Sequence, residues 1–563
     1  MTGLRRRADR LRRACGDLLF SNPLYRALRR PFPARAVRGL AAAPPDPWPG
    51  DAARGARIVA GEFPLAGSDI VLPRRGDGPS DAARKGVADW VPADGGDAWR
   101  AALYGFGWLD DLRAVGTDAA RRCAQADIAA WLAAKNLPAL ACRADIAGRR
   151  LCAWLTHFAF LDAGIGEEQR RRLLAGMARE TRHLARALRF APDGAARLTA
   201  LKGLVYGTHC LPAGAGARRR AVDRLAREIA RQIRADGGHV ARNPAVLAVL
   251  LRDFVDLRAL LSNAGAPIPD GLQNAIDRMA PMLRFFRHGD GGLALFNGAG
   301  EDAAWLLDMS LARADAPGKP FAYAPHSGFQ RLAAGRCLAI LDAGAPDPAP
   351  DSAAHAGTLS FEMSVGKQRL IVNCGAHIGD DPAWRQSQRA TAAHSTLTLA
   401  DTNSAEIAAD GGLGRRPGKV ACRRNEAEDG IWIEAEHDGY VAPFGFRHRR
   451  RLWLAAAGDD LRGEDNLDPA GARAARDFAV RFHLHPSVKA SLAENGTQAL
   501  LRLPGGEGWR LRSGGGRLEI ADSVYLGDGG RPRRAEQIVV SGTAAPEGAQ
   551  IKWAFQRIPR RAE

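Results

Sequence analysis

Three polar residues follow a Gly-Gly pair at the predicted start of a helix. They are His239, Arg242 and Asn243 in the segment DGGHVARNPAVL, where Pro244 suits a first helical turn. Free backbone N–H groups at a helix N-terminus attract anions, so these side chains could bind a carboxylate while His239 transfers a proton. Asn243 could equally serve only as the cap of the helix, with its neighbours in solvent.

A second candidate site is the glycine-rich loop in RFFRHGDGGLALFNGAGE (284–301), which holds Arg287, His288 and Asp290 between aromatic runs. An arginine can bind a carboxylate with two hydrogen bonds, and loops on rigid scaffolds often carry binding residues. This loop could therefore line a sugar cleft, or it could only connect two domains. Its glycine spacing is not that of a phosphate-binding loop, because no GK[ST] follows it.

Polar and aromatic residues also gather in the second half of the chain. His355 and His394 are predicted to stand on strands, where His355 could act as an acid or base and His394 is better explained as structural. Trp384 lies beside Arg385 and just before Arg389, in a loop expected to lead into a strand. We predict Trp384 to be a platform on which a sugar ring stacks, with the two arginines as carboxylate ligands.

The region from about residue 99 to 311 is predicted to be helical. In GRRLCAWLTHFAFLDAG, the apolar residues Leu151, Trp154, Leu155 and Phe158 form the stripe of an amphipathic helix. Similar stripes occur in 221–233 and 245–261. Helices of this length joined by short loops favour antiparallel helix pairs.

After about residue 317 the apolar period changes from 3.6 to 2. TLSFEMSV alternates, Gly366 and Lys367 turn the chain, and RLIVN continues as the second strand of a hairpin. In FAVRFHLHPSV, Phe478, Val480 and Phe482 face one way. Helices first and strands afterwards predict two domains, the second an antiparallel β-sandwich.

Length and composition agree with this organisation. A chain of 563 residues exceeds one ordinary hydrophobic core, and 46% apolar with 25% charged residues is typical of a soluble globular protein. We assign 1–85 to a basic leader and wrapping segment with strands near 58–72, 86–316 to a helical domain and 317–563 to a β domain.

The charge of the chain limits its partners. A formal net charge of +18 favours polyanions such as acidic polysaccharide, anionic lipid or nucleic acid. No helix-turn-helix, RRM or zinc-finger pattern supports sequence-specific binding to nucleic acid. No transmembrane segment is predicted, and no signal-peptide core is visible, which by itself indicates the cytoplasm. A basic N-terminal segment resting on an anionic membrane stays open.

Four stretches together resemble the heparinase II/III family of bacterial polysaccharide lyases. They are WRAALYGFGWLDDLRAVG with GRRLCAWLTHFAFL, DGGHVARNPAVL, AHAGTLSFEMSVGKQRLIVNCG, and WRQSQRATAAHSTLTLADTNS followed by HDGY…HRRR. The resemblance covers roughly residues 95–490 and implies an α/α toroid, or incomplete helical barrel, followed by an antiparallel β-sandwich. It also implies β-elimination on a uronic-acid-containing polysaccharide in a cleft between the domains, usually in the cell envelope.

This chemistry needs a group that neutralises the C5 carboxylate, a base that removes the C5 proton and an acid for the leaving oxygen. In lyases of this type Asn, His or Arg holds the carboxylate, and a Tyr helped by a His transfers the protons. In this chain the family's Asn-His pair falls at Ala195–Ala196 and its Tyr at Val246. The remaining candidates for proton transfer are His239, His288, His355 and Tyr206. The predicted substrate-binding residues are Arg242, Asn243, Arg287, Trp384, Arg385 and Arg389.

The resemblance also implies a structural zinc, which some family members hold in the β domain. The family's His-x-Asp becomes His355-Ala356-Gly357, and an expected Asp is replaced by Asn373, while His394 matches the family's strand histidine. An amide oxygen is a poor substitute for a carboxylate, and structural zinc needs several protein ligands. We therefore expect no required cofactor, with His355, Asn373 and His394 as weak candidates for a metal site.

Two functions of different classes follow from the sequence. One is a polysaccharide lyase. The other is a non-catalytic glycan-binding or envelope-polymer assembly protein on a lyase scaffold, because the family's Tyr, Asn-His pair and Asp are missing and a fold does not determine a function. Nucleic-acid binding through bulk charge rests on the isoelectric point alone. The sequence indicates neither the polysaccharide nor the oligomeric state.

Overall fold

The computed structural model describes residues 37–72, 90–92, 94–134, 137–346, 354–408 and 411–559, with a few residues between 11 and 25. The chain divides into two compact units: Met1–Gln232 with Arg252–Ala275, and Ile233–Leu251 with Ile276–Glu563. The boundary passes through two long helices, α12 (Pro244–Asn263) and α13 (Asp270–Phe285).

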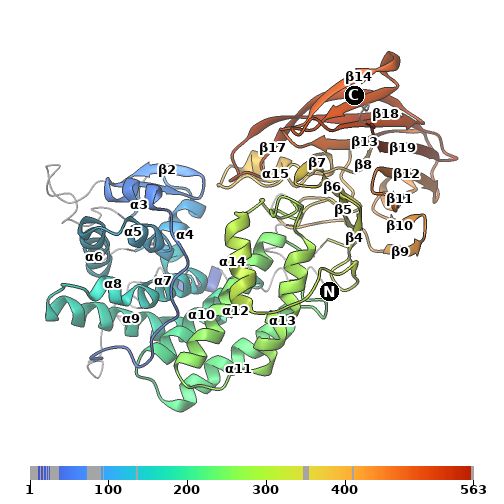
Figure 1. The fold of residues 1–563 in the computed structure, drawn as a ribbon. Helices are drawn as coiled ribbons and strands as arrows, with labels where there is room; N and C mark the ends of the chain where they lie inside the picture. The colour runs from blue at the N-terminus through green and yellow to red at the C-terminus, as the bar shows by residue number, and fades with distance from the viewer. Residues whose placement is uncertain are drawn as a thin grey trace. The chain divides into compact units, whose positions relative to one another are not determined.

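The first unit is mainly helical (Figure 1). Its helices, besides the parts of α12 and α13, are α3 (Ala52–Val59), α4 (Asp97–Gly105), α5 (Leu109–Val115), α6 (Asp118–Ala133), α7 (Ala144–Thr156), α8 (Phe158–Asp162), α9 (Glu167–Ala187), α10 (Ala195–Cys210), α11 (Ala215–Gln232) and the 3₁₀ turns η2 (Ala139–Cys142) and η3 (Leu188–Phe190). The strands predicted near 58–72 are a hairpin of β1 (Glu62–Leu65) and β2 (Ser68–Val71), whereas Ile58 belongs to α3.

Helix α10 contacts α7, α9 and α11, and almost all of its residues from Leu198 to Cys210 are buried. A helix that is apolar on every side must be covered on every side, which explains its place inside the helical layer. Two glycines allow α7 and α10 to touch, because a Cβ at Gly203 would lie 2.5 Å from the Cα of Gly148. The predicted helical region is confirmed, and it forms the toroid part of the fold.

The second unit is built on two antiparallel sheets. Its remaining helices are α14 (Ala304–Ala314), α15 (Pro382–Ser387), α16 (Val441–Phe444) and the 3₁₀ turns η4 (Thr391–Ala393) and η5 (Glu494–Gly496). Its strands are β3 (Tyr323–Ala324), β4 (Phe329–Ala334), β5 (Cys337–Asp342), β6 (Phe361–Val365), β7 (Gln368–Val372), β8 (Leu397–Leu399), β9 (Val420–Ala427), β10 (Gly430–His437), β11 (Phe446–Ala455), β12 (Asp460–Pro469), β13 (Arg476–Leu484), β14 (Lys489–Ala493), β15 (Gln498–Arg502), β16 (Gly508–Gly514), β17 (Arg517–Tyr525), β18 (Arg533–Ala544) and β19 (Ala549–Arg557).

One sheet has the order β14-β15-β16-β19-β12-β11-β10-β9 and the other β17-β18-β13-β7-β6-β5-β4-β3, with β8 added against β13. Side chains of both sheets share one hydrophobic core, in which the rings of Phe361 and Trp553 stack 5.5 Å apart. The alternation predicted for β13 is confirmed, because Phe478, Val480 and Phe482 all lie in this core. The predicted antiparallel β-sandwich is therefore correct, and β6 and β7 form the predicted hairpin.

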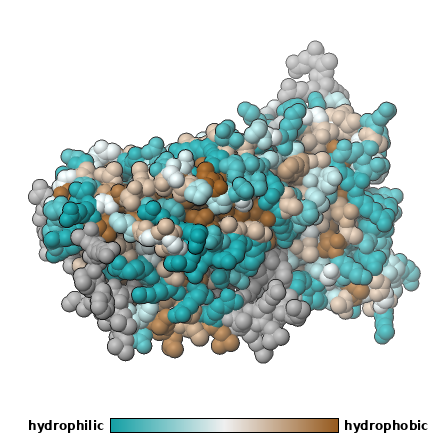
Figure 2. Space-filling model, turned by 90° about the horizontal axis from the view of Figure 1, so that it is seen from below, coloured by the Kyte–Doolittle hydropathy of each residue, from teal (hydrophilic) through white to brown (hydrophobic). Residues whose placement is uncertain are grey.

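No helix in the described part of the chain combines the length and the apolar character needed to cross a membrane. On the face seen in Figure 2, hydrophilic residues cover most of the described surface and hydrophobic residues gather in small patches.

The structure corrects three local predictions. His355 and His394 do not stand on strands: His355 lies in the loop before β6, and His394 follows the 3₁₀ turn that precedes β8. Trp384 lies in helix α15 rather than in a loop leading into a strand. Asp381 caps this helix by accepting from the backbone N–H groups of residues 383 and 384, and a proline occupies the first helical position. These two residues start a short helix within a region where strands were expected.

Candidate functional site

Arg242, at the end of the loop between α11 and α12, is buried and bound within its own unit. Its guanidinium donates to the backbone oxygens of Ser327 at 2.7 Å and Ala345 at 3.2 Å, and it pairs with the carboxylate of Asp342. One face of the group also lies over the ring of Phe329, 4.6 Å from its centre. Arg242 therefore fixes its loop to the sheet and leaves little capacity for a ligand carboxylate.

Asn243 caps helix α12, because its side-chain oxygen accepts from the backbone N–H of Val246 at 3.0 Å. Its amide nitrogen donates to the backbone oxygen of Asn297 at 2.7 Å. Asn297 in turn donates to the backbone oxygen of Arg242 and accepts from the backbone N–H of His355. Asn297 has a φ of 52°, a conformation that asparagine tolerates better than most residues. It therefore joins the start of α12 to the loop that carries His355.

His355 contacts His394 directly, with its Nδ1 3.0 Å from Nε2 of His394. Nδ1 of His394 lies 2.7 Å from the backbone oxygen of Ala390, which can only accept, so this nitrogen carries the proton of His394. Nε2 of His394 then accepts from Nδ1 of His355. In the neutral ring, the remaining nitrogen of His355, Nε2, therefore carries a lone pair and no proton. This atom is buried and has no hydrogen-bond partner among the described residues.

The environment of His355 keeps its ring neutral. Burial lowers its pKa well below the ordinary value, and the nearby His394 and Arg389 lower it further. Burial also lowers the pKa of His394, to about 4. A base is most effective when its pKa lies near the working pH, so His355 is a weak base as it stands.

The residues at the expected zinc position do not fit the metal. A Cβ at Gly357 would lie 2.7 Å from Cδ2 of His394, so no ligand side chain can replace this glycine while His394 keeps its place. The side-chain oxygen of Asn373 already accepts from the backbone N–H of Ser395 at 3.0 Å. Within the described ranges, no group of three or more His, Cys, Asp or Glu side chains could hold a metal ion.

His239 and His288 are both buried inside the second unit. Nδ1 of His239 accepts from the backbone N–H of Ala241 at 3.2 Å. His288 uses both ring nitrogens, at 2.9 Å from the Ser364 hydroxyl and 3.0 Å from the Glu362 carboxylate. Burial lowers the pKa of His288 despite that carboxylate. His288 thus ties the glycine-rich loop to β6, and both of its nitrogens are occupied.

Two more candidate arginines are held by protein groups. Arg287 pairs with Asp308 at 2.8 Å. Arg389 donates to the backbone oxygens of Ala354 at 2.9 Å and Gly411 at 2.8 Å, and it lies against the segment that carries His355. Its third guanidinium nitrogen, Nη2, is buried and has no hydrogen-bond partner in the described structure. Burial lowers the pKa of Arg389. Its unused buried donor could face a ligand.

Trp384 and Arg385 lie on α15, at the surface of the second unit. The Trp384 ring stacks on His377, with centroids 5.7 Å apart and planes 11° apart, and is half-buried. Arg385 is exposed and lies 3.5 Å from Asp380. These two side chains remain accessible, and the charge of Arg385 is near enough to Arg389 to contribute to the lowered pKa of that arginine.

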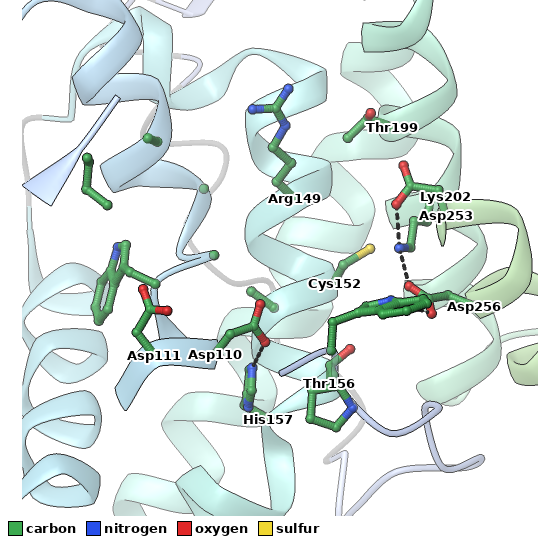
Figure 3. Close-up of a pocket in the computed structure, with 18 of the residues that line it drawn as sticks. Asp110, Asp111, Arg149, Cys152, Thr156, His157, Thr199, Lys202, Asp253 and Asp256 are labelled. Carbon is green, nitrogen blue, oxygen red and sulfur yellow. Dashed lines mark hydrogen bonds and ion pairs between the residues drawn. The ribbon is translucent and has the colours of Figure 1, made fainter. Parts of the chain in front are cut away.

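Tyr206 belongs to the helical unit, where it lines a cavity of about 430 Å³. Figure 3 shows this cavity with its labelled residues Lys202, Asp253 and Asp256. The ammonium of Lys202 lies 5.5 Å from the centre of the Tyr206 ring and 2.7 Å from both Asp253 and Asp256. Asp256 also accepts from the indole N–H of Trp48 at 3.0 Å. Burial and then Asp256 raise the pKa of Tyr206 well above its ordinary value, so a phenolate is disfavoured at neutral pH.

The predicted site residues therefore fall into separate groups. The structure brings together, through Asn297 and Asp342, the residues Arg242, Asn243, His355 and His394, with Arg389 beside His355. The other residues of the second unit, His239, His288, Arg287, Trp384 and Arg385, have local partners of their own. Tyr206 lies in the other unit.

Known proteins similar to this chain point to one family. A family model described as Heparinase II/III-like, C-terminal, matches residues 316–554. FtsZ-localized protein C of Caulobacter vibrioides (strain NA1000 / CB15N) is 34% identical over 546 residues, which cover 92% of this chain and 90% of that protein. The chain belongs to the heparinase II/III family.

Solved structures of this family share the fold. The crystal structure of heparinase III matches with a TM-score of 0.74 and 12% identity, over 90% of this chain and 84% of that one. A mutant of the heparan sulfate lyase HepC from Pedobacter heparinus matches with a TM-score of 0.61 and 14% identity, over 96% of this chain and 88% of that one. At these identities the likeness shows the heparinase fold alone. It says nothing of which side chains remain active.

Sequence reasoning missed the residues that hold this candidate site together. Asn297 precedes Gly298, and both have positive φ, so the Asn-Gly pair was a turn signal that could have been noticed. Asp342 and Glu362 had no such signal, because Glu362 is an acidic residue inside a predicted strand and no motif marked the segment that holds Asp342. Only the fold shows that Asp342 faces Arg242 and that Glu362 faces His288.

Proposed function

We propose that this chain is a glycan-binding protein on a polysaccharide-lyase scaffold that has lost β-elimination. The loss follows from the environment of the proton-transfer candidates. His239 and His288 are buried and engaged, and His355 is 3% exposed and neutral. Elimination needs both a base and an acid beside a bound uronate, and the lone pair of His355 supplies at most one of them.

Two of the three tyrosines of the second unit, Tyr440 and Tyr525, are buried and their hydroxyls are engaged. The Tyr440 hydroxyl donates to the backbone oxygen of Leu397 at 2.9 Å, and the Tyr525 hydroxyl donates to the Glu301 carboxylate. Burial raises the pKa of both phenols. The family's tyrosine position is Val246 in this chain. The third tyrosine of this unit, Tyr323 on β3, is 53% exposed, and within the described residues its hydroxyl has no hydrogen bond to the group around His355. The replacement of the family's tyrosine by valine is the observation that carries the proposal.

A place of action is suggested by the relative's name. A protein 34% identical over most of its length is called FtsZ-localized protein C. We extend this to the chain and propose that it acts with FtsZ at the bacterial cell envelope, where acidic polymers are within reach.

The location is tested by expressing a fluorescent fusion of the full chain in Caulobacter vibrioides and depleting FtsZ. The proposal expects a band of fluorescence that coincides with labelled FtsZ and disperses on depletion. The exposed variant Trp305→Ala serves as the control and should keep the band. Uniform fluorescence that does not respond to depletion would contradict the proposed location.

A second candidate function is β-elimination with His355 as the base. One observation favours it: among the described residues Nε2 of His355 is an unpartnered lone pair, and the charge of Arg389, whose Nη2 is unused, acts on the His355 ring. In such a step Nε2 would take the C5 proton, Arg389 would face the carboxylate, and the glycosidic oxygen would leave with a proton from solvent. The required exposure of a buried ring argues against this route.

A further inference from the structure

The sheet that ends with β9 carries a shallow hollow on its outer face, with a volume of about 540 Å³. Trp432 and Trp453 form one end of this hollow, with ring centroids 5.8 Å apart and planes at 41°. Trp432 is 44% exposed, which is unusual for so large an apolar side chain. The indole N–H of Trp453 is buried without a hydrogen-bond partner in the described part of the chain.

Strand register places the other residues of the hollow beside these two rings. Trp432 pairs with Trp453, Trp453 with Arg462, Arg462 with Ala554, and Ala554 with Arg512, which gives one row across β10, β11, β12, β19 and β16. The first four of these strands are seen side by side in Figure 1. Ala554 has a short side chain, so the surface is lower at this position than at the larger side chains on either side. The hollow is therefore a trough between the two indoles and Arg512.

The neighbouring row of residues adds two more cationic side chains, Arg451 and Lys552. In the strand register Arg451 lies opposite Glu464, and Glu464 lies opposite Lys552. The lining of the hollow contains four cationic side chains and one carboxylate, Glu464, and two of the cations are already paired, Arg451 with Glu434 and Arg462 with Asp460. Arg512 and Lys552 are exposed, and neither has an ion pair within the described residues. Such a patch attracts anions.

We propose that this trough, formed by Trp432, Trp453, Arg462, Arg512 and Lys552, is the surface on which the protein binds an acidic polysaccharide. The inference rests on the glycan-binding function proposed above and places the binding on the outer face of the sandwich. The exposed Trp432 ring stacks against the C–H face of a sugar ring, next to the Trp453 ring, whose face is covered by the Arg462 guanidinium 4.8 Å from its centre. The unpaired cations Arg512 and Lys552 bind carboxylates along the chain of sugars.

A sugar polymer fits this surface better than an acidic peptide. The trough crosses the middle of the sheet, where the backbone groups of β11, β12 and β19 already pair with one another, so a peptide cannot add as a strand. Its floor of small residues gives no deep apolar pocket for a peptide side chain. A shallow trough with tilted aromatic walls matches a flat ring that is apolar on its face and charged at its edge.

Binding is measured by isothermal titration of the full chain with size-defined oligosaccharides. The probes are a uronate oligomer, a neutral oligomer of equal length and poly-glutamate. The test variants are Trp432→Ala and the double variant Arg512→Gln with Lys552→Gln. The controls are Trp305→Ala, which removes an equally exposed indole, and Arg219→Gln with Arg220→Gln, which removes two exposed charges from α11.

We expect each test variant to bind the uronate oligomer at least about tenfold more weakly, while both controls bind like the wild type. The neutral oligomer should bind far more weakly to every form. If the wild type binds the uronate oligomer and the test variants match it, the trough is overturned and the glycan-binding function stands. If poly-glutamate alone binds and the test variants lose it, the surface is a peptide site and the inference is wrong. If the wild type binds no sugar, the proposed function itself fails.

Discussion

Replacing Arg450 by methionine should destabilise the β-sandwich by about 3–5 kcal/mol and lower its melting temperature by about 10 °C. Arg450 is completely buried between the sheets and binds Asp465 through two hydrogen bonds of 2.7 and 3.0 Å. It also donates to the backbone oxygens of Leu359 and Ser395, which belong to the segments beside His355 and His394. Its loss leaves a buried carboxylate without its cation.

The measurement is thermal unfolding of the purified variant, followed by circular dichroism. Arg451→Met is the matched control, because Arg451 is the next residue on the same strand and its side chain is 45% exposed. Exposed ion pairs contribute about 0–1 kcal/mol, so this variant should melt close to the wild type. Equal melting of the two variants would show that Arg450 does not organise the core.

Acidification should destabilise the protein well before its carboxylates titrate. Burial lowers the pKa of His483 to about 3, with an opposing hydrogen bond to Ala392, and it lowers the pKa of His437 well below the ordinary value. Below about pH 6.5 the unfolded chain protonates these rings while the folded chain keeps them neutral. The unfolded state then binds more protons, so stability falls as the pH falls. His483 alone contributes a loss on the order of 3 kcal/mol by about pH 4.

The check is guanidinium unfolding at a series of pH values from about 7 down to about 4. In the variant His483→Gln, the unfolding free energy should fall less steeply with pH than in the wild type. The exposed His326→Gln is the control and should keep the wild-type slope. A stability that is flat or rises on acidification would contradict the assignment of neutral buried histidines.

Much of the fold was readable from the sequence. The alternation of Phe478, Val480 and Phe482 predicted a strand with one buried face. Gly366 marked the turn of the hairpin, and this glycine has a φ of 55°. Pro244 correctly marked the start of α12. These predictions succeeded because each depends on local period or on a single backbone preference.

The site was harder to predict because its chemistry depends on contacts distant in sequence. Arg242 looked like an anion ligand, but it is neutralised by Asp342, one hundred residues later. His355 looked like an acid or base, but its ring donates to His394 and is buried with a lowered pKa. Spacing along the chain cannot indicate which polar side chains a fold will bury against each other.

The central claim, binding without cleavage, is tested most directly by ultraviolet absorbance during incubation with a panel of acidic polysaccharides. Wild type, His355→Ala and the trough variant Trp432→Ala are compared at matched protein and polymer concentrations. We expect no rise from unsaturated uronate in any sample, with binding of the polymer retained by the wild type and by His355→Ala. A steady rise in the wild type that His355→Ala abolishes would contradict the account and establish a lyase that uses His355 in place of the tyrosine.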